Sequence, residues 1–254
     1  MSAATVDDRF DLGGKVALVT GGSRGLGREM ALAFARAGAD VVIASRKQER
    51  CDATAREVEA LGRRALAHAC HVGDWEALGA LTERAWSHFG RIDVLVNNAG
   101  MSPLYPSLTE VSEALWDKVL AVNLKGPFRL SALMGERMAA AGGGAIINVS
   151  SVASIRPTPF ETPYAAAKAG LNALTVAFAH AYGPSVRVNC IMAGPFLTDI
   201  SKAWDPAMLQ HFERTAALRR AGQPSEIVGA ALYFASPASS FTTGAVLRVD
   251  GGQP

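Results

Sequence analysis

The sequence predicts a doubly wound α/β domain in which a seven-stranded parallel sheet carries helices on both faces. Short apolar runs rich in β-branched residues alternate with longer Ala- and Leu-rich stretches of helical period from residue 16 to residue 250. A strand–helix–strand rhythm this regular favours parallel pairing with right-handed crossovers. No Pro-, Gly- or Ser-rich linker and no repeat of solenoid length interrupts it. We therefore expect one domain at 11–254, after a flexible segment at 1–10.

The expected strands are the short apolar runs themselves. In chain order they are VALVT (16–20), DVVIAS (40–45), RALAHAC (64–70), IDVLVNNA (92–99), AIINVS (145–150), VRVNCIM (186–192) and AVLRVD (245–250). The helical stretches between them lie near 25–37, 48–61, 75–89, 110–140, 164–182 and 224–235. The connection at 193–223 is much longer than the few residues that usually join a strand to a helix, which is typical of a lid over a substrate site.

The composition excludes several classes of protein. Hydrophobic residues make up 49% and charged residues 19% of the 254 residues, which is enough to bury a sizeable core and argues against disorder. The 25 Lys and Arg are scattered among 23 acidic residues, so no basic stripe indicates a nucleic acid or an anionic membrane as partner. No apolar signal segment and no stretch of about 18 apolar residues occurs, so we expect a cytoplasmic protein.

The cysteines indicate a reducing compartment. The chain has three, Cys51, Cys70 and Cys190, an odd number without a CxxC pair. His68, Cys70 and His71 could form half of a metal site, but no second ligand pair with suitable spacing follows. We therefore favour an ordinary strand end and expect no metal.

A glycine-rich turn, TGGSRGLG at 20–27, follows the first expected strand and opens the first long helix. A dinucleotide-binding turn requires this context, because the free N–H groups of a helix N-terminus bind pyrophosphate. The spacing G-x-x-x-G-x-G of Gly21, Gly25 and Gly27 differs from the G-x-G-x-x-G of longer dehydrogenases. Since a tight turn also needs glycine, this motif alone indicates a nucleotide only weakly.

Further motifs accompany the turn. They are NNAG at 97–100, Asn123 within VNLKGPF, Ser151 after INVS, and Tyr164-Ala-Ala-Ala-Lys168 at the start of a helix. Together, in this order and at these separations, they resemble the short-chain dehydrogenase/reductase family in its core-length branch, from about Lys15 to Gly252. The resemblance implies a Rossmann fold, a nicotinamide dinucleotide cofactor and the interconversion of a carbonyl and an alcohol.

The catalytic residues expected for this chemistry include a tuned phenol. Reduction of a carbonyl by hydride leaves an alkoxide that needs a proton, and oxidation of the alcohol needs that proton removed. Lys168 lies one helical turn after Tyr164, where its ammonium can stabilise a phenolate, although Y-x-x-x-K also occurs by chance as an exposed pair. The resemblance makes Tyr164 the acid/base. The resemblance also implies that Lys168 lowers the pKa of the phenol and binds ribose. It implies that Ser151, rather than Ser150, donates to the substrate oxygen, and that Asn123 supports a proton relay through water.

The end of the second strand selects between the two nicotinamide cofactors. In a nucleotide-binding sheet this position meets the adenosine ribose, where a carboxylate suits NAD and an arginine suits the 2′-phosphate of NADP. The chain has Ser45-Arg46-Lys47 there, with serine where NAD users of the family commonly have Asp. We therefore expect Arg46 and Arg24 to flank the phosphate of NADP(H), with NAD(H) less favoured. The alternative is that both arginines are solvated surface charges.

The remaining cofactor contacts follow from the resemblance. His71-Val72 stands where the family usually has Asp-Val, whose Asp contacts the adenine amino group. A neutral His71 imidazole could accept a hydrogen bond from that amino group, whereas a protonated imidazole could only donate. Thr198 is expected to bond the nicotinamide carboxamide, and Ala193 replaces a proline, which would loosen the hinge of the lid. The full set of expected cofactor residues is Gly21, Ser23, Arg24, Gly25, Leu26, Gly27, Ser45, Arg46, Lys47, His71, Val72, Asn98, Ala99, Gly100, Tyr164, Lys168, Gly194, Pro195 and Thr198.

The residues expected around the substrate are mostly apolar or small, which favours an apolar or bulky carbonyl compound. They are Met101, Pro103, Tyr105, Ile155, Pro157, Phe160, Met192 and Phe196. Arg156 is the local charge that could meet an acidic substrate. Within the lid Trp204, Met208 and Phe212 recur every four residues, as on one helix face, where they pack against the body or line the pocket.

Two other functions remain open, and one is excluded. A 3-oxoacyl-[acyl-carrier-protein] reductase would dock its acidic carrier on paired basic residues; Arg129 is suitably placed, but Tyr182-Gly183-Pro184-Ser185 supplies no second arginine. A non-catalytic NADP-binding scaffold or sensor would not need the Asn, Ser, Tyr and Lys set. A serine hydrolase is excluded because no G-x-S-x-G surrounds Ser151. The resemblance further implies a homotetramer, built through the long helices at 110–140 and 164–182 and the last strand.

Overall fold

The seven-stranded parallel sheet is confirmed by the structure, a computed structural model that describes residues 6–198, 201 and 206–254. The strand order is β3-β2-β1-β4-β5-β6-β7, and each neighbouring pair is parallel. The strands are Val16–Thr20 (β1), Asp40–Ser45 (β2), Ala65–Ala69 (β3), Val94–Asn97 (β4), Gly144–Ser151 (β5), Val186–Ala193 (β6) and Val246–Val249 (β7). The order reverses between β1 and β4, and in doubly wound sheets ligands bind at this switch point.

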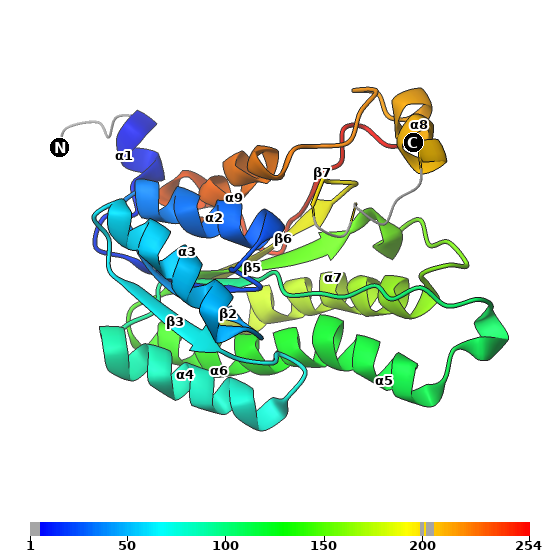
Figure 1. The fold of residues 1–254 in the computed structure, drawn as a ribbon. Coiled ribbons are helices and arrows are strands. Elements are labelled where there is room, and N and C mark those ends of the chain that lie inside the picture. Colours follow the sequence, from blue (N-terminus) through cyan, green and yellow to red (C-terminus); the bar gives the residue numbers. More distant parts are fainter. Residues whose placement is uncertain (1–5, 199–200, 202–205) are drawn as a thin grey trace.

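Helices cover both faces of the sheet, as Figure 1 shows. One face carries α2 (Gly25–Arg36), α3 (Gln48–Ala60) and α9 (Val228–Ala235), and the other carries α4 (Trp75–Phe89), α5 (Glu113–Leu120), α6 (Gly126–Ala140) and α7 (Thr162–Tyr182). A short helix α8 (Pro206–Thr215) lies within the long connection after β6. None of the helices in the described part of the chain is long and apolar enough to cross a membrane.

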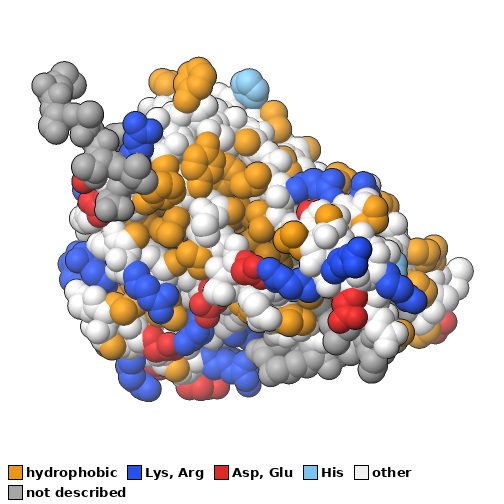
Figure 2. All heavy atoms as spheres, turned by 90° about the horizontal axis from the view of Figure 1, so that it is seen from above, with side chains coloured by type: hydrophobic (Ala, Val, Ile, Leu, Met, Phe, Trp, Pro, Cys, Tyr) orange, Lys and Arg blue, Asp and Glu red, His pale blue; other side chains and the backbone are white. Residues whose placement is uncertain are grey.

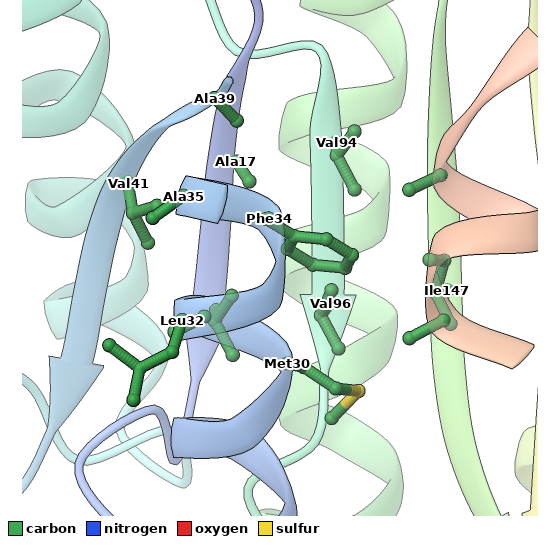
Figure 3. Close-up of a cluster of buried hydrophobic side chains, with 14 of the residues drawn as sticks. Ala17, Met30, Leu32, Phe34, Ala35, Ala39, Val41, Val94, Val96 and Ile147 are labelled. Carbon is green, nitrogen blue, oxygen red and sulfur yellow. The ribbon is translucent and has the colours of Figure 1, made fainter. Parts of the chain in front are cut away.

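The core explains why the strands read as continuous apolar runs. All five residues of β1 are buried, as expected for a strand with helices on both sides. On the α2 face, Met30 and Phe34 are fully buried and project onto Val94 and Val96 of β4 (Figure 3). This packing fixes α2, and with it the glycine turn that precedes the helix.

Three elements differ from the expectation. The helix expected at 110–140 is divided into α5 and α6 by a π-helical turn at Ala121–Lys125. The N-terminal segment contains a short helix, α1 (Val6–Phe10), and residues 1–5 lie outside the described residues. Of the stripe expected in the lid, Trp204 and the side chain of Met208 lie outside the described residues, and Phe212 is half-buried on α8.

The expected functional segments meet at one edge of the sheet, because the carboxyl ends of parallel strands point the same way. The glycine turn follows β1, residues 45–47 end β2, residues 98–100 follow β4, and Ser151 ends β5. The register places Thr20 beside Ala44 and Ser151 beside Ala193. The crevice at this edge is therefore the candidate site.

Candidate active site

Asn123 lies at the centre of the π-helical turn between α5 and α6 and is fully buried. Its Nδ2 donates to the carbonyl oxygens of Val119 and Met101, both at 2.9 Å, and its Oδ1 accepts from the Met101 amide at 3.1 Å. A π-helical turn inside an α-helix is frequently a functional feature. Here it turns the amide of Asn123 toward the loop after β4 and fixes that loop beside the site.

Ser151, Tyr164 and Lys168 come together from β5 and α7. The Ser151 hydroxyl lies close enough to Tyr164 to lower the pKa of the phenol, and Ser151 Oγ accepts from the Ala153 amide at 3.2 Å. Lys168 Nζ donates to the Val149 carbonyl oxygen at 2.7 Å and lies 5.6 Å from the centre of the Tyr164 ring. The arrangement brings a hydroxyl, a phenol and an amine into one buried corner of the crevice.

Ser150 has a different role from its neighbour Ser151. Its hydroxyl is buried and donates to the main-chain carbonyl of Lys168 at 3.2 Å. Because successive side chains of a strand point to opposite faces, Ser150 ties β5 to α7 whereas Ser151 reaches the phenol. This geometry agrees with the choice of Ser151 as the donor.

Burial sets the protonation of the pair on α7. It outweighs the lowering effect of the Ser151 hydroxyl and, together with the charge of Glu161, raises the pKa of the Tyr164 phenol to about 12. Burial also lowers the pKa of the Lys168 ammonium to about 8. Lys168 Nζ is directed at Val149 in the protein without a ligand, and its expected lowering of the pKa of Tyr164 stays a prediction.

Replacing Lys168 by methionine tests the cost of burying its ammonium. Because folding lowers the pKa of Lys168 from 10.5 to about 8, the unfolded chain binds more protons than the folded one between these pH values. Below pH 8 the full cost of burying the charged Lys168 lowers the stability of the wild type. This cost disappears as the pH rises from about 8 to 10.5. We expect Lys168→Met to exceed the wild type in stability at neutral pH and to lose this advantage towards pH 10 in urea unfolding. If the stability advantage of Lys168→Met does not change with pH, the wild type does not pay a cost for burying the Lys168 ammonium.

Two residues outside the expected set support Ser151. Asn172, on α7 one turn after Lys168, donates from Nδ2 to Ser154 Oγ at 2.9 Å, and Ser154 Oγ donates to the Ser151 carbonyl at 2.6 Å. The helix that carries Tyr164 and Lys168 thus also holds the backbone of Ser151. The spacing of Tyr164, Lys168 and Asn172 at every fourth residue was a sequence signal for this shared face.

The glycine turn has the shape of a phosphate cradle. Gly21 has a φ of 65° and Gly25 a φ of 52°, values that favour glycine, and a Cβ on Gly27 would lie 2.3 Å from the Gly21 carbonyl. Arg24 occupies the N-cap position of α2, and no side chain at this position caps the first amides of the helix, which have no partner within the helix itself. Asn98 Nδ2 donates to the Thr20 carbonyl at 2.9 Å and holds the turn against the end of β4. These residues fit a dinucleotide pyrophosphate.

The basic residues expected to bind the 2′-phosphate follow the two adjacent strands β1 and β2. The Gly21 amide donates to the Ala44 carbonyl at 2.8 Å, which holds the glycine turn against the end of β2. Ser45 is half-buried, and Arg24 and Arg46 are exposed. The structure thus brings both arginines to the same edge of the sheet, with no carboxylate in the Ser45-Arg46-Lys47 segment.

His71 is arranged differently from the expectation. Its Nδ1 accepts a hydrogen bond from the Gly73 amide at 3.1 Å, so in the neutral ring the hydrogen is on Nε2. The free ring nitrogen can therefore donate but not accept. The expected acceptance from an adenine amino group is wrong for this arrangement, because the backbone of Gly73 already uses the acceptor nitrogen.

The base of the lid is closed by backbone hydrogen bonds. The Leu197 amide donates to the Gly222 carbonyl at 2.8 Å, and the Gly222 amide donates to the Pro195 carbonyl at 2.9 Å. Ala193 pairs with Ser151 on one side and Val249 on the other, so the sheet holds this residue from both sides. The looser hinge expected for the lid stays a prediction.

Thr198, the expected partner of the nicotinamide, lies against the glycine turn. A Cβ built on Gly25 would come within 3.5 Å of the Thr198 side chain. Gly194 follows β6 and donates from its amide to the Val249 carbonyl at 2.9 Å. The start of the lid therefore lies beside the phosphate cradle.

The substrate side contains a charge that the sequence analysis missed. A narrow recess, too small to hold a water molecule, lies beside Tyr164 and is lined by Pro103, Tyr105, Leu115, Val119, Glu161, Pro163 and Tyr164. Arg156, the expected local charge, donates from Nη1 to the Gln253 carbonyl at 3.0 Å. Ile155 and Phe160, expected at the mouth, are exposed. Glu161 stands three residues before Tyr164, and this spacing was the signal that could have identified it.

Comparisons with known proteins agree with this geometry. The family described as "Enoyl-(Acyl carrier protein) reductase" matches residues 21–253. Dehydrogenase/reductase SDR family member 4 from Homo sapiens is 35% identical over 257 residues, which cover 100% of this chain and 92% of that protein.

Solved structures match over nearly the whole chain. A gluconate 5-dehydrogenase from Burkholderia cenocepacia, in complex with NADP and tartrate, has a TM-score of 0.93 at 35% identity, with 98% of each chain covered. A 7α-hydroxysteroid dehydrogenase, in complex with NADH and 7-oxo glycochenodeoxycholic acid, has a TM-score of 0.93 at 34% identity and the same coverage. With this coverage, this identity and this fold, the chain belongs to the short-chain dehydrogenase/reductase family.

Proposed function

We propose that this oxidoreductase interconverts a carbonyl compound and a secondary alcohol with NADP(H), and that Tyr164 is its acid/base. The meeting of Ser151, Tyr164 and Lys168 beside the phosphate cradle carries the proposal. Each has the chemistry that its role requires, since a hydroxyl can hold an oxygen, a phenol can give a proton and an ammonium can stabilise a phenolate.

The bound cofactor supplies or accepts a hydride at the carbonyl carbon of the substrate. The Ser151 hydroxyl donates a hydrogen bond to the substrate oxygen and holds it beside the phenol. Tyr164, whose pKa of about 12 keeps it protonated at neutral pH, donates its proton to that oxygen during reduction. Oxidation requires the phenolate, and the Lys168 ammonium is the group placed to stabilise it. The resting protonation therefore favours reduction.

Asn123 contributes to the site by holding its own main chain in place. Both hydrogens of its amide are donated, to Val119 and Met101, so the side chain has no hydrogen left for a relay water. A relay through water would use the main-chain carbonyl of Asn123, and the side chain would keep that carbonyl in place.

The choice of NADP(H) rests on this chain's own basic residues, because one of the similar structures holds NADP and the other NADH. Arg46 and Arg24 stand at the edge where β1 and β2 end, and Ser45 takes the position at which a carboxylate would repel a 2′-phosphate. Gly21, Gly25 and Gly27 with the amides of α2 would hold the pyrophosphate.

A substrate panel tests the proposal. The protein is incubated with NADPH and a series of ketones, quinones and acyl thioesters. We expect it to consume NADPH with at least one ketone, and the loss of NADPH fluorescence measures this consumption. If the protein binds NADPH but consumes it with no member of the panel, the alternative of a cofactor-binding scaffold is favoured instead.

The alternative of an acyl-carrier-protein reductase is weakened by the position of Arg129. Its guanidinium lies 4.5 Å from the centre of the Trp75 indole, so it is engaged in a cation–π contact. The segment Gly183-Pro184-Ser185, exposed after α7, supplies no second arginine. We therefore keep this reaction as one arm of the panel, through its acyl thioesters.

We also propose that the protein is a cytoplasmic homotetramer that acts on small molecules. Figure 2 shows hydrophobic side chains gathered on the face where α9 and β7 lie, and Phe241, Val246 and Leu247 are exposed. Phe128 and Val176 are exposed on the helices of the opposite layer. Large exposed apolar patches are typical of protein interfaces. Sedimentation of the full chain is expected to give four copies per particle.

A further inference from the structure

His71 lies just after β3, beside the segment at the end of β2 that would meet the adenosine ribose. The Cys70 amide donates to the Ser45 carbonyl at 2.8 Å, so the chain leaves β3 directly next to Ser45. In a doubly wound sheet the pyrophosphate of a dinucleotide lies at the end of the first strand and the ribose at the end of the second. The base that this ribose carries is therefore within reach of the residues that follow β3, where His71 is exposed.

The imidazole ring of His71 is seated on the backbone of Gly73. Its Nδ1 accepts from the Gly73 amide at 3.1 Å, and a Cβ on Gly73 would lie 2.9 Å from Cε1 and 3.1 Å from Nδ1 of the ring. The Asp74 amide closes the same turn by donating to the His71 carbonyl at 2.9 Å. A side chain at position 73 would displace the ring, so the glycine and the hydrogen bond together keep Nδ1 on the backbone.

This orientation leaves the His71 ring with a donor and no acceptor. In the neutral ring Nδ1 is occupied and Nε2 carries the hydrogen, and in the protonated ring both nitrogens are donors. The nearest carboxylate along the chain, that of Asp74, caps α4 by accepting from the Glu76 and Ala77 amides at 3.0 and 3.1 Å. In either protonation state, therefore, His71 can donate to a base but cannot accept from it.

Purine bases differ in what they offer to such a donor. Adenine carries an amino group at position 6, which donates, whereas a 6-oxopurine such as hypoxanthine carries an oxygen there, which accepts. The neighbouring N7 is an acceptor in both bases. The Nε2 hydrogen of His71 can bond N7 or the 6-oxo group, but it cannot bond the 6-amino group. Adenine thus gains nothing from its amino group at this side chain.

We propose that His71 is a specificity-determining residue for the cofactor base, and that it lets a 6-oxopurine dinucleotide bind as tightly as the adenine dinucleotide. This inference rests on the proposed use of NADP(H). It adds to that proposal which part of the base the chain recognises, and it concerns the binding of the cofactor, apart from the chemistry at Tyr164.

Two reduced cofactors that differ only at position 6 of the purine test the inference. They are NADPH and its deaminated form, reduced nicotinamide hypoxanthine dinucleotide phosphate, which has the same 2′-phosphate, pyrophosphate and nicotinamide. The dissociation constant of each is measured without a ketone, from the dihydronicotinamide fluorescence that both share. For the wild type, the constant of the deaminated cofactor is expected to lie within about threefold of that of NADPH, or below it.

A substitution at His71 supplies the missing acceptor. The carboxylate of His71→Asp would accept from the 6-amino group and repel the 6-oxo group, so this variant is expected to favour NADPH by about tenfold or more. The ratio of the two constants cancels any general effect of the new charge on the phosphates. His88→Asp, the same change at an exposed histidine in the last turn of α4, is expected to keep the wild-type ratio.

The outcomes distinguish failure of this inference from failure of the proposed function. A wild type that favours NADPH by more than about threefold, or a ratio that His71→Asp leaves unchanged, overturns the inference and leaves the proposed use of NADP(H). If the wild type binds neither reduced cofactor, the proposed use of NADP(H) is wrong and the inference fails with it. Equal binding of both cofactors by the wild type, together with a preference for NADPH in His71→Asp and not in His88→Asp, supports the inference whether or not a ketone is reduced.

Discussion

Tyr164→Phe is expected to reduce turnover at least a hundredfold and to leave the dissociation constant of NADPH almost unchanged. General acid–base groups contribute about 10²- to 10⁴-fold to rate, and the change removes the phenolic hydroxyl, which is the proton donor, while it keeps the ring. The phosphate cradle at Gly21–Gly27 and the basic residues after β2 are not touched. Steady-state kinetics with an accepted ketone measures turnover, and quenching of protein fluorescence measures NADPH affinity.

Two checks accompany this variant. Wild-type reduction should stay nearly constant with rising pH until the phenol begins to ionise, because the pKa of Tyr164 is about 12 and the protonated form is the donor below it. Tyr105→Phe is a matched control, since it removes a hydroxyl from the same recess that bonds only to Pro159 and Thr162 backbone groups in the described structure. Turnover of Tyr164→Phe within a few-fold of the wild type would rule out the proposed acid/base.

Ser45→Asp combined with Arg46→Ala is expected to shift the preference from NADPH to NADH by roughly 10- to 100-fold. Hydrogen bonds to charged groups contribute about 1.5–3 kcal/mol, which corresponds to this range. The aspartate would accept from the ribose hydroxyls of NADH and repel the 2′-phosphate of NADPH, and the alanine removes the attraction. The ratio of kcat/KM for the two cofactors measures the shift.

Arg56→Asp is the control for this change, because Arg56 is an exposed arginine on α3 and its replacement by aspartate lowers the net charge by two, as the double substitution does. Its cofactor ratio should equal that of the wild type. If the double substitution leaves the ratio unchanged as well, Arg46 is a solvated surface charge and the preference for NADP(H) would have to come from other residues.

The strands and the order of the motifs were predictable from the sequence because both depend on local patterns. Strands buried on two faces read as continuous apolar runs, and six expected helical stretches correspond to helices of the structure, one of them divided by the turn at Asn123. A π-helical turn of five residues leaves no signal in the apolar period. The geometry that holds the Asn123 side chain therefore could not be predicted.

The error at His71 has a physical cause, since it depends on what lies beside the residue in space. His71 was expected to offer an acceptor, but the Gly73 amide already occupies that nitrogen. A hydrogen bond to the backbone therefore decided the outcome.

The amino-acid sequence alone was sufficient to predict the α/β fold and the family, because residue type, order and spacing carry that information, and the same motifs singled out Asn123, Ser151, Tyr164 and Lys168 as the proposed catalytic set. The environment of this set required the tertiary structure. Desolvation, which depends on every atom packed around a group, raises the pKa of Tyr164 to about 12 and lowers that of Lys168 to about 8. The same packing placed the carboxylate of Glu161 in the recess beside Tyr164, where the sequence analysis had expected an apolar wall.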